Sequence, residues 1–414
     1  MNRDSLHFFL LNVGHLLDHL FMLIFATVAA LALTREWGLS YAELIAYGTP
    51  GFFAFGVCSL PAGWLADKWN REAMMSVFFF GIGLAAMATG LARTPLQVGA
   101  GLFAIGVFAA IYHPVGLAIV TAKWKNTGSR LAVNGVWGNL GVAGAALLTG
   151  LLIDRGGWRT AFVLPGVVAL AAGIAHTVAR WPEISAPRKA GTGAAASTAG
   201  LTPEARALIR RVSLVVFVTA AVSSIIFQST TFALPKIFEE RLHGLTAALA
   251  AHLKGMVSGG RSDAATVVGV LAFVVFAVAS LAQLVVGRML DRYGARPVFM
   301  VAAAIQLLCF SLMPGLTDGL AVAVALGFML GAFGQIPIND FLIGRMAMGE
   351  FRARAYAVRY MISFSVLAAT LPLISFIYAD WGFDVLFRIL AAAALVILAA
   401  VSLLPRQAGA LATK

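Results

Sequence analysis

The stretch GWLADKWNRE, residues 63–72, has a second and altered copy in GRMLDRYGAR, residues 287–296. In both copies a glycine is followed four residues later by an aspartate, and a basic residue comes directly after the aspartate. The same offset along the chain relates GWRTAF (157–162) to GFDVLF (382–387), with one residue of slippage. These matches predict that the chain is built from two related halves.

The composition is typical of a protein that lies in a lipid bilayer. Apolar residues make up 60% of the chain, charged residues only 12%, and the mean hydropathy is +0.89, which excludes an ordinary soluble globular protein. A helix needs roughly 20 apolar residues to cross the hydrocarbon core of a membrane. Such runs recur and predict about twelve spans, at residues 6–33, 42–65, 73–92, 96–121, 131–153, 158–180, 211–235, 265–287, 297–315, 319–345, 355–378 and 384–405.

The fold class predicted is therefore an all-α membrane protein with twelve transmembrane helices in two six-helix halves. We expect an N-terminal half over residues 1–181 and a C-terminal half over 211–414. Residues 182–210 between them are rich in Pro, Gly, Ala and Ser, which is typical of a flexible cytoplasmic linker. The second half carries an insertion at about 237–263, where apolar residues at helical spacing predict an amphipathic helix on the outer surface.

The basic residues predict the orientation of the chain. Most of the 30 Lys and Arg residues fall in loops on one side, which the positive-inside rule assigns to the cytoplasm. Both termini are therefore expected to be cytoplasmic, in a multi-pass protein of the plasma (inner) membrane. The formal charge of +12 has the same origin, so no nucleic-acid partner is expected. We expect a monomer that is surrounded by lipid.

The sequence gives no support for a cofactor or a disulfide. Cys58 and Cys309 both fall within predicted spans, so neither a disulfide nor a thiolate metal site is indicated. A Walker A loop and other nucleotide motifs are missing, which argues against drive by ATP. No enzyme activity is expected; an intramembrane enzyme that uses the histidines described next is the rival hypothesis of a different class.

The first predicted span contains titratable residues in a run that is otherwise apolar. In GHLLDHLFMLIFATVAALAL (14–33) these are His15, Asp18 and His19. A charge at the centre of a membrane helix costs roughly 2.5–3.5 kcal/mol on insertion scales, and such residues are candidates for function. His15 and His19 are four residues apart and share a helix face, which Asn12 extends. We predict a polar stripe that faces the interior of the protein.

In the repeated stretch at 63–72 and in three other stretches, the chain resembles the major facilitator superfamily of transporters. The Gly-x-x-x-Asp-x-x-x-Arg signature of that family is present at residues 63–71. Three further stretches resemble the fosmidomycin-resistance branch of exporters: GHLLDH (14–19), AAIYHPVG (109–116) and GVWGNLGVAG (135–144). The resemblance implies two bundles that rock about a substrate site near the midplane of the bilayer. It also implies that the first and fourth spans line the central cavity.

His113 of the fourth span is predicted to meet the polar stripe of the first. Counting 1.5 Å per residue from the inner ends of the spans places His15 about 14 Å deep and His113 roughly 12 Å deep. Because histidine titrates near pH 6.5, His15, Asp18, His19 and His113 are the candidate proton-coupling residues. Two other interpretations stay open. The four residues could only pack helices together, or they could bind a divalent metal ion, for which His and Asp are usual ligands.

Charged residues near the predicted cytoplasmic ends of the spans are candidate gating residues. The resemblance implies that Asp67 docks near Arg354, at the start of the eleventh span, when the cytoplasmic side is closed. An exposed ion pair between Asp67 and Arg71 is the alternative. Asp291 and Arg292 stand in the second copy of the signature.

Asp340 and Arg359 have about the same predicted depth on the tenth and eleventh spans. Because burying one charge alone is costly, we expect the two to pair, either as a structural contact or as an inner gate. If they act independently, Arg359 becomes a binding partner for an anionic solute.

Uncharged polar and aromatic residues of the spans are the candidates for binding substrate. They are Asn12, Tyr112, Asn134, Trp137, Asn139, Gln228, Gln335 and Asn339, together with Arg359. In the fifth span Gly135, Gly138, Gly141 and Gly144 recur at every third residue, and they predict close packing against a neighbouring helix.

These features predict a proton-coupled secondary active transporter, an antiporter that exports a small organic solute or drug by alternating access. An importer of a small organic metabolite, coupled to protons or to another solute, would need the same parts. A divalent metal transporter that uses the His and Asp residues is the second alternative.

Overall fold

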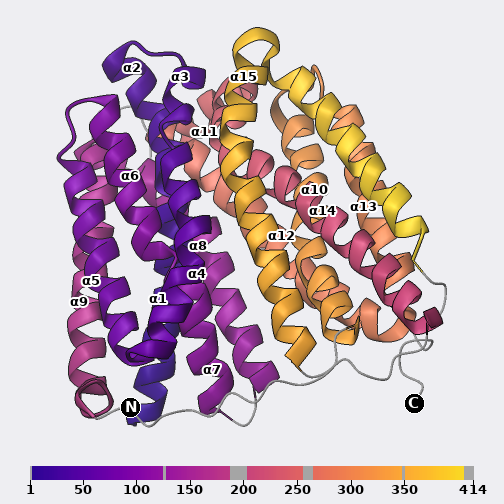
Figure 1. Ribbon diagram of the computed structural model, residues 1–414. Coiled ribbons are helices and arrows are strands. Elements are labelled where there is room, and N and C mark those ends of the chain that lie inside the picture. The colour runs from indigo at the N-terminus through magenta and orange to yellow at the C-terminus, as the bar shows by residue number, and fades with distance from the viewer. Residues whose placement is uncertain (1, 125–126, 187–202, 255–263, 347–349, 405–414) are drawn as a thin grey trace. The chain divides into compact units, whose positions relative to one another are not determined.

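The computed structural model describes residues 2–124, 127–186, 203–254, 264–346 and 350–404, and the described chain is helical (Figure 1). In a few helical segments the backbone is described but the side chains are not. The helices are α1 (Arg3–Val28), η1 (Ala29–Leu33), α2 (Thr34–Trp37), α3 (Tyr41–Ala46), α4 (Thr49–Lys68), α5 (Arg71–Gly90), α6 (Pro95–Ala109), η2 (Tyr112–Gly116), α7 (Leu117–Lys123), α8 (Thr127–Gly156), α9 (Trp158–Ser185), α10 (Pro203–Arg241), α11 (His243–Lys254), α12 (Ala264–Tyr293), α13 (Ala295–Leu312), α14 (Asp318–Met346) and α15 (Glu350–Ser402).

Eleven helices of the described chain are long and apolar enough to cross a membrane. The last of them, Met361–Ser402, has 42 residues, and at 1.5 Å per residue it is about 63 Å long, twice the ~30 Å of hydrocarbon. Its backbone breaks at Gly382, where φ is +68°. This helix therefore contains both the eleventh and the twelfth predicted spans. The predicted all-α membrane fold is confirmed.

The repeat that was read from the sequence has a counterpart in the backbone. Gly157, before α9, has a φ of +79°, and its partner in the repeat, Gly382, has the same left-handed sign. Glycine adopts this conformation without the steric cost that a Cβ would add. The connections at 157 and 382 are thus the same kind of turn, one in each half of the sequence.

The chain divides into two compact units. Unit 1 holds Met1–Lys189 together with Thr231–Ala277 and Leu371–Phe376. Unit 2 holds Ala190–Thr230, Val278–Thr370 and Ile377–Lys414. Unit 1 therefore contains the first six spans, the whole of α11 and parts of α10, α12 and α15.

Within unit 1, α8 binds the beginning of α12 closely. Asp154 Oδ2 accepts hydrogen bonds from the backbone N–H of Thr266 at 2.7 Å and from its hydroxyl at 2.5 Å. A Cβ added to Gly269 would lie 2.5 Å from the carbonyl oxygen of Ala146. The glycine therefore permits an approach that a larger residue would prevent.

The helix α1 lies at the centre of unit 1, with 83% of its most apolar stretch buried. Glycines of α8 pack directly on it. A Cβ on Gly138 would lie 2.6 Å from His15 Nε2, and one on Gly141 would overlap the carbonyl oxygen of Leu16. Gly135 and Gly144, in contrast, have no other side chain or helix within 4 Å of such a Cβ. The predicted close packing of the glycines is therefore correct for the two in the middle.

The predicted insertion at 237–263 is divided between two helices. Residues 237–241 continue α10, where Phe238 is fully buried. The separate helix α11 follows over His243–Lys254 and leaves Leu249 exposed. Residues 255–263 lie outside the described chain.

Candidate functional site

A π-helical turn, η2, places the functional residues of the fourth span. It covers the sequence YHPVG and contains Pro114, which has no backbone N–H and so interrupts the helical hydrogen-bond ladder. Turns of this kind occur frequently at functional sites. Here the turn directs two neighbouring residues toward α1. The hydroxyl of Tyr112 donates to the carbonyl of Leu11 at 2.8 Å, and His113 Nε2 lies 3.4 Å from Asp18 Oδ2.

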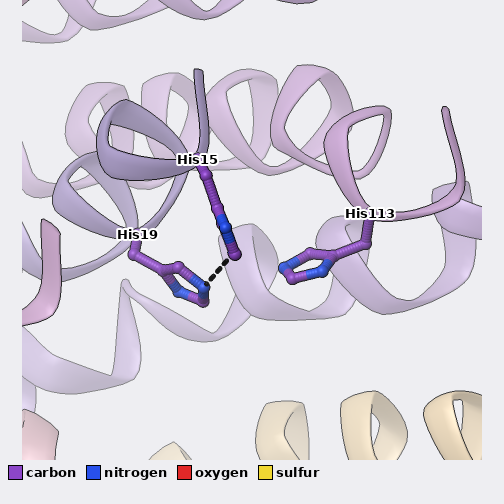
Figure 2. A group of neighbouring side chains, drawn as sticks. All are labelled: His15, His19 and His113. Carbon is purple, nitrogen blue, oxygen red and sulfur yellow. Dashed lines mark hydrogen bonds between the residues drawn. The ribbon is translucent and has the colours of Figure 1, made fainter. Parts of the chain in front are cut away.

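His15, His19 and His113 come together in unit 1, as Figure 2 shows, and with Asp18 we term them the histidine group. The ring centres of His15 and His113 are 5.3 Å apart, and those of His19 and His113 are 5.4 Å apart. His15 is buried, whereas His19 and His113 are partly exposed. The structure thus brings together the four residues that the sequence analysis selected.

The hydrogen bonds of His15 fix which of its ring nitrogens carries the proton. Its Nδ1 lies 2.8 Å from the backbone carbonyl oxygen of Asn134, an acceptor, so Nδ1 must be the donor. In the neutral ring Nε2 is then an acceptor. His19 Nε2 lies 3.2 Å away and donates to it (Figure 2). A chain of directed hydrogen bonds therefore runs from His19 through His15 to the backbone of α8.

Asp18 is the acidic residue of the histidine group, and it is fully buried. Its side chain is 0% exposed, and neither of its oxygens accepts a hydrogen bond from the described residues. A buried carboxylate without hydrogen bonds is unstable unless it is protonated or lies beside a cation. The neighbour that can supply either a proton or a positive charge is His113. Asp18 and His113 are therefore suited to share one proton.

A second layer of polar residues holds the histidine group in place. The side-chain amide of Asn134 donates to Asn12 Oδ1 at 2.9 Å and to the hydroxyl of Tyr112 at 2.8 Å. The Tyr112 ring stacks on His15, with the ring centres 4.8 Å apart. All three supporting side chains are buried and bond to one another. Tyr112 and Asn134 thus contact His15, and Asn12 is joined to them through Asn134. Their predicted contact with substrate stays a prediction.

The histidine group also has the spacing of a metal site. Ring nitrogens of His15, His19 and His113 lie within 4.8 Å of one another. However, the lone pair of His15 Nε2 is occupied by the proton that His19 donates. In the arrangement described, a hydrogen bond joins His19 to His15, and His113 contacts both rings edge-on.

The other residues predicted to contact substrate in unit 1 lie outside this network. Trp137 packs edge-on against Phe9, with the ring centres 5.5 Å apart, and it is half-buried. Asn139 is half-buried as well.

Unit 2 carries uncharged polar residues where unit 1 carries histidines. The hydroxyl of Ser223 donates to Gln335 Oε1 at 2.6 Å, and the amide of Gln335 donates in turn to Gln306 Oε1. Thr219 donates to Asn339 Oδ1 at 3.2 Å. Gln228 is buried, with a side-chain exposure of 2%. Gln306 and Thr219 were not selected from the sequence, because single polar residues in apolar runs carry no spacing that marks them.

Most of the predicted gating residues lie outside the described side chains. These are Asp67, Asp291, Asp340, Arg354 and Arg359, so the contacts predicted between Asp67 and Arg354 and between Asp340 and Arg359 stay predictions. Arg71 and Arg292 are exposed, and the guanidinium of Arg292 lies 5.2 Å from the centre of the Tyr293 ring.

A second buried polar cluster was missed by the sequence analysis. Glu72 Oε2 lies 3.0 Å from His7 Nε2 and 3.3 Å from His176 Nε2, and Arg180 donates to Glu72 Oε1 at 3.3 Å. The four residues, which we term the Glu72 cluster, join α1, α5 and α9. Its nitrogens and carboxylate also have metal-site spacing. Because the ammonium of Lys123 donates to His7 Nδ1 at 3.1 Å, His7 Nε2 carries a proton and points it at Glu72. The cluster therefore combines the ion pair of Arg180 with Glu72 and a neutral His7 ring that faces the other oxygen of the same carboxylate.

Removal of the Glu72 carboxylate is expected to destabilise unit 1. Glu72→Gln removes the buried carboxylate that faces the guanidinium of Arg180, and we expect a loss of about 2 kcal/mol, read as a lower thermal unfolding midpoint in detergent. Glu183→Gln is the matched control, since Glu183 also pairs with Arg180, at 3.0 Å, but is 44% exposed; it should change the midpoint little. Equal losses in the two variants would contradict a structural role that depends on burial.

Comparisons with known proteins agree with this architecture. Residues 11–262 and 261–413 match the Major Facilitator Superfamily. A puromycin resistance protein, pur8, of Streptomyces alboniger is 32% identical over 148 residues, 35% of this chain and 29% of that protein. A D-galactonate transporter of Escherichia coli is 28% identical over 147 residues, 34% of each chain. A Haemophilus influenzae protein named for metabolite transport is 26% identical over 314 residues, 71% of this chain and 67% of that protein.

The first two matches thus cover about a third of the relatives' lengths. Among solved structures, a bacterial homologue of the lysosomal transporter Spinster, inward-facing and unoccupied, has a TM-score of 0.67 at 15% identity, over 98% of this chain and 95% of that one. The peptide transporter POT in complex with sulfate has a TM-score of 0.69 at 13% identity, over 98% and 99%. These structures share the fold. The chain belongs to the Major Facilitator Superfamily, and it is a multi-pass membrane protein.

Proposed function

We propose that the protein is a proton-coupled secondary transporter that exports a small organic solute, and that the histidine group carries the proton. The observation that carries this proposal is the fully buried Asp18 carboxylate beside His113, inside a membrane-spanning helix. An ionisable residue at such a depth is expensive to retain without a function.

The coupling step follows from the exposure of the group. The His113 side chain is 15% exposed, so water on one side of the membrane can deliver a proton to it. The proton is then shared with Asp18, which removes an unpaired buried charge. When the cavity opens to the other side, the same His113 edge releases the proton. His15 and His19 extend the chain of groups that can accept a proton.

The solute is expected to bind uncharged hydrogen-bonding groups and partly apolar walls. Gln228, Gln335 and Asn339 of the second half, with Trp137 and Asn139 of the first, are the residues that we assign to solute binding. Solutes in the relatives' names are puromycin, hexose phosphate, D-galactonate, sulfoacetate and gallate. Puromycin favours export, whereas the others are polar metabolites that fit an importer.

The remaining features of the proposal concern topology. Both termini lie in the cytoplasm, residues 182–210 link the two six-helix halves, and the protein acts as a monomer in the plasma membrane. Asp67 docks near Arg354 to close the cytoplasmic side.

Flux into proteoliposomes under an imposed pH gradient tests the function. Labelled puromycin, glucose 6-phosphate, D-galactonate, sulfoacetate and gallate are assayed separately. Because an antiporter exchanges solute for protons, the transported solute should accumulate on the acidic side, and a protonophore should abolish the accumulation. Accumulation on the alkaline side would show a symporter, the importing alternative. Transport of a solute at equal rates with and without the gradient would contradict proton coupling.

The same vesicles test the metal interpretation, which the mutual spacing of three imidazoles favours. Zn²⁺ or Co²⁺ would have to enter the vesicles saturably, with loss of entry in His19→Gln. Such entry would replace the organic solute by a metal ion as the substrate.

A further inference from the structure

The glycine of the family signature packs against the turn that carries His113. A Cβ added to Gly63 would lie 3.2 Å from Cβ and 4.0 Å from Cγ of Pro114, and no other residue comes within 4 Å of it. A distance of 3.2 Å is shorter than nine in ten real contacts of a Cβ atom, so a side chain at residue 63 would require Pro114 to shift by a few tenths of an ångström. Because residue 63 is a glycine, α4 and η2 can approach this closely without such a shift.

The same face of α4 also touches His113 itself. Phe55 precedes Gly63 by eight residues, and residues spaced by four share a helix face. The Phe55 ring meets the His113 ring nearly edge-on, with the centres 5.9 Å apart. Hence α4 holds η2 at two points, one against the imidazole and one against the next residue.

The contact between His113 and Asp18 depends closely on where the His113 ring lies. Its Nε2 is 3.4 Å from Asp18 Oδ2, longer than the 2.7–2.9 Å typical of a charge-assisted hydrogen bond. A change of a few tenths of an ångström in η2 would therefore decide whether the two groups form such a bond. Pro114 is covalently joined to His113, so a shift of Pro114 moves His113 as well.

The second copy of the signature has no such contact. A Cβ added to Gly287 would meet no atom of the described residues within 4 Å. Pro337 of α14 follows Pro114 at nearly the same separation in sequence as Gly287 follows Gly63. The helix around Pro337 is a regular α-helix, whereas Pro114 lies in a π turn. The repeat thus supplies a comparison in which the same motif glycine lacks a neighbouring proton site.

We propose that Gly63 is a positioning residue for His113, so that the signature glycine sets the geometry of the proton pair in addition to shaping the loop that follows it. This inference rests on the proposed function, in which His113 and Asp18 share a proton. It does not depend on which solute is carried.

Nitrogen-15 NMR of ring-labelled histidine in the purified full-length protein tests the proposal without any solute. The signals of His113 are assigned by their loss in His113→Gln. In Gly63→Ala we expect the chemical shifts of these signals to move, because a displaced His113 ring has a different distance to Asp18. The signals of His7 and His176, in the Glu72 cluster, should stay where they are. Gly287→Ala is the matched control and should move none of the three.

A double variant distinguishes positioning from general damage. Pro114→Gly removes the Cβ that a new methyl group at residue 63 would meet, so adding Gly63→Ala to Pro114→Gly should cause little further change in the His113 signals. If Gly63→Ala does not yield folded protein, Gly63→Ala with Pro114→Gly is compared with Pro114→Gly alone. Unchanged His113 signals in Gly63→Ala would overturn the proposal, as would equal movement in Gly287→Ala.

The outcomes separate this proposal from the proposed function. The His113 signals could move in Gly63→Ala while transport by the wild type is independent of the pH gradient. That result would uphold the positioning role and refute proton coupling. Proton-coupled transport by the wild type, with His113 signals that are unchanged in Gly63→Ala, would uphold proton coupling and refute the positioning role.

Discussion

Asp18→Asn is expected to abolish proton-driven transport while solute exchange at equal pH on both sides continues. Asparagine has nearly the same volume as aspartate but cannot take up or release a proton. The variant therefore keeps the packing around a fully buried side chain and loses only the acid. Accumulation against a gradient should fall to the level of empty vesicles, while exchange of puromycin, or of whichever panel solute is transported, stays within the error of the wild-type measurement.

The control for this variant is Asp380→Asn, which makes the same chemical change at an exposed position of α15. It should accumulate solute as the wild type does. Full proton-driven accumulation in Asp18→Asn would show that the proton is carried elsewhere, and His15 with His19 would then be the next residues to test.

Gly138→Ala is expected to disable the proton site through packing alone. The new methyl carbon would lie 2.6 Å from His15 Nε2, the atom that accepts the proton from His19. Overpacking of this kind costs about 1–3 kcal/mol, and the ring of His15 must turn away from His19 to relieve it. We expect at least a tenfold loss of proton-driven flux and a lower thermal unfolding midpoint.

The fifth span contains its own controls for this experiment. Gly135→Ala and Gly144→Ala place a methyl group where nothing lies within 4 Å, so both should transport normally, and an alanine in a helix can even stabilise it by up to about 1 kcal/mol. In Gly141→Ala the three heavy atoms nearest to the new methyl group all belong to the backbone of Leu16. This variant should lower stability and leave the pH profile of the remaining flux unchanged. A normal pH profile in Gly138→Ala would contradict the role given to the contact with His15.

The sequence predicted the spans and the histidine group because both depend on local rules. Hydropathy marks each membrane helix, and four-residue spacing places His15 and His19 on one face. The rise per residue then brings His113 to the same depth, and the structure has the His15 and His113 rings 5.3 Å apart. The π turn that aims His113 at Asp18 could not be predicted, because Pro114 alone allows several local distortions.

The Glu72 cluster shows why other contacts could not be predicted. His7, Glu72 and His176 come from three helices that are far apart in the sequence, and no periodicity connects them. The glycines of the fifth span make a similar point. A step of three residues turns a helix by about 300°, or 60° short of a full turn, so four glycines spread over half the circumference. The sequence predicted close packing for the four glycines together, but it could not tell which of them face a neighbour. The structure shows that Gly138 and Gly141 face α1.

Every member of the histidine group, and every residue described as holding it, belongs to α1, α4, η2 or α8, all within unit 1. The internal distances of the site therefore depend on unit 1 alone. In the proposed cycle, its proton occupancy changes only when different water reaches the exposed edge of His113. The pH on each side of the membrane should then set the protonation of Asp18 and His113 while water from that side reaches the site.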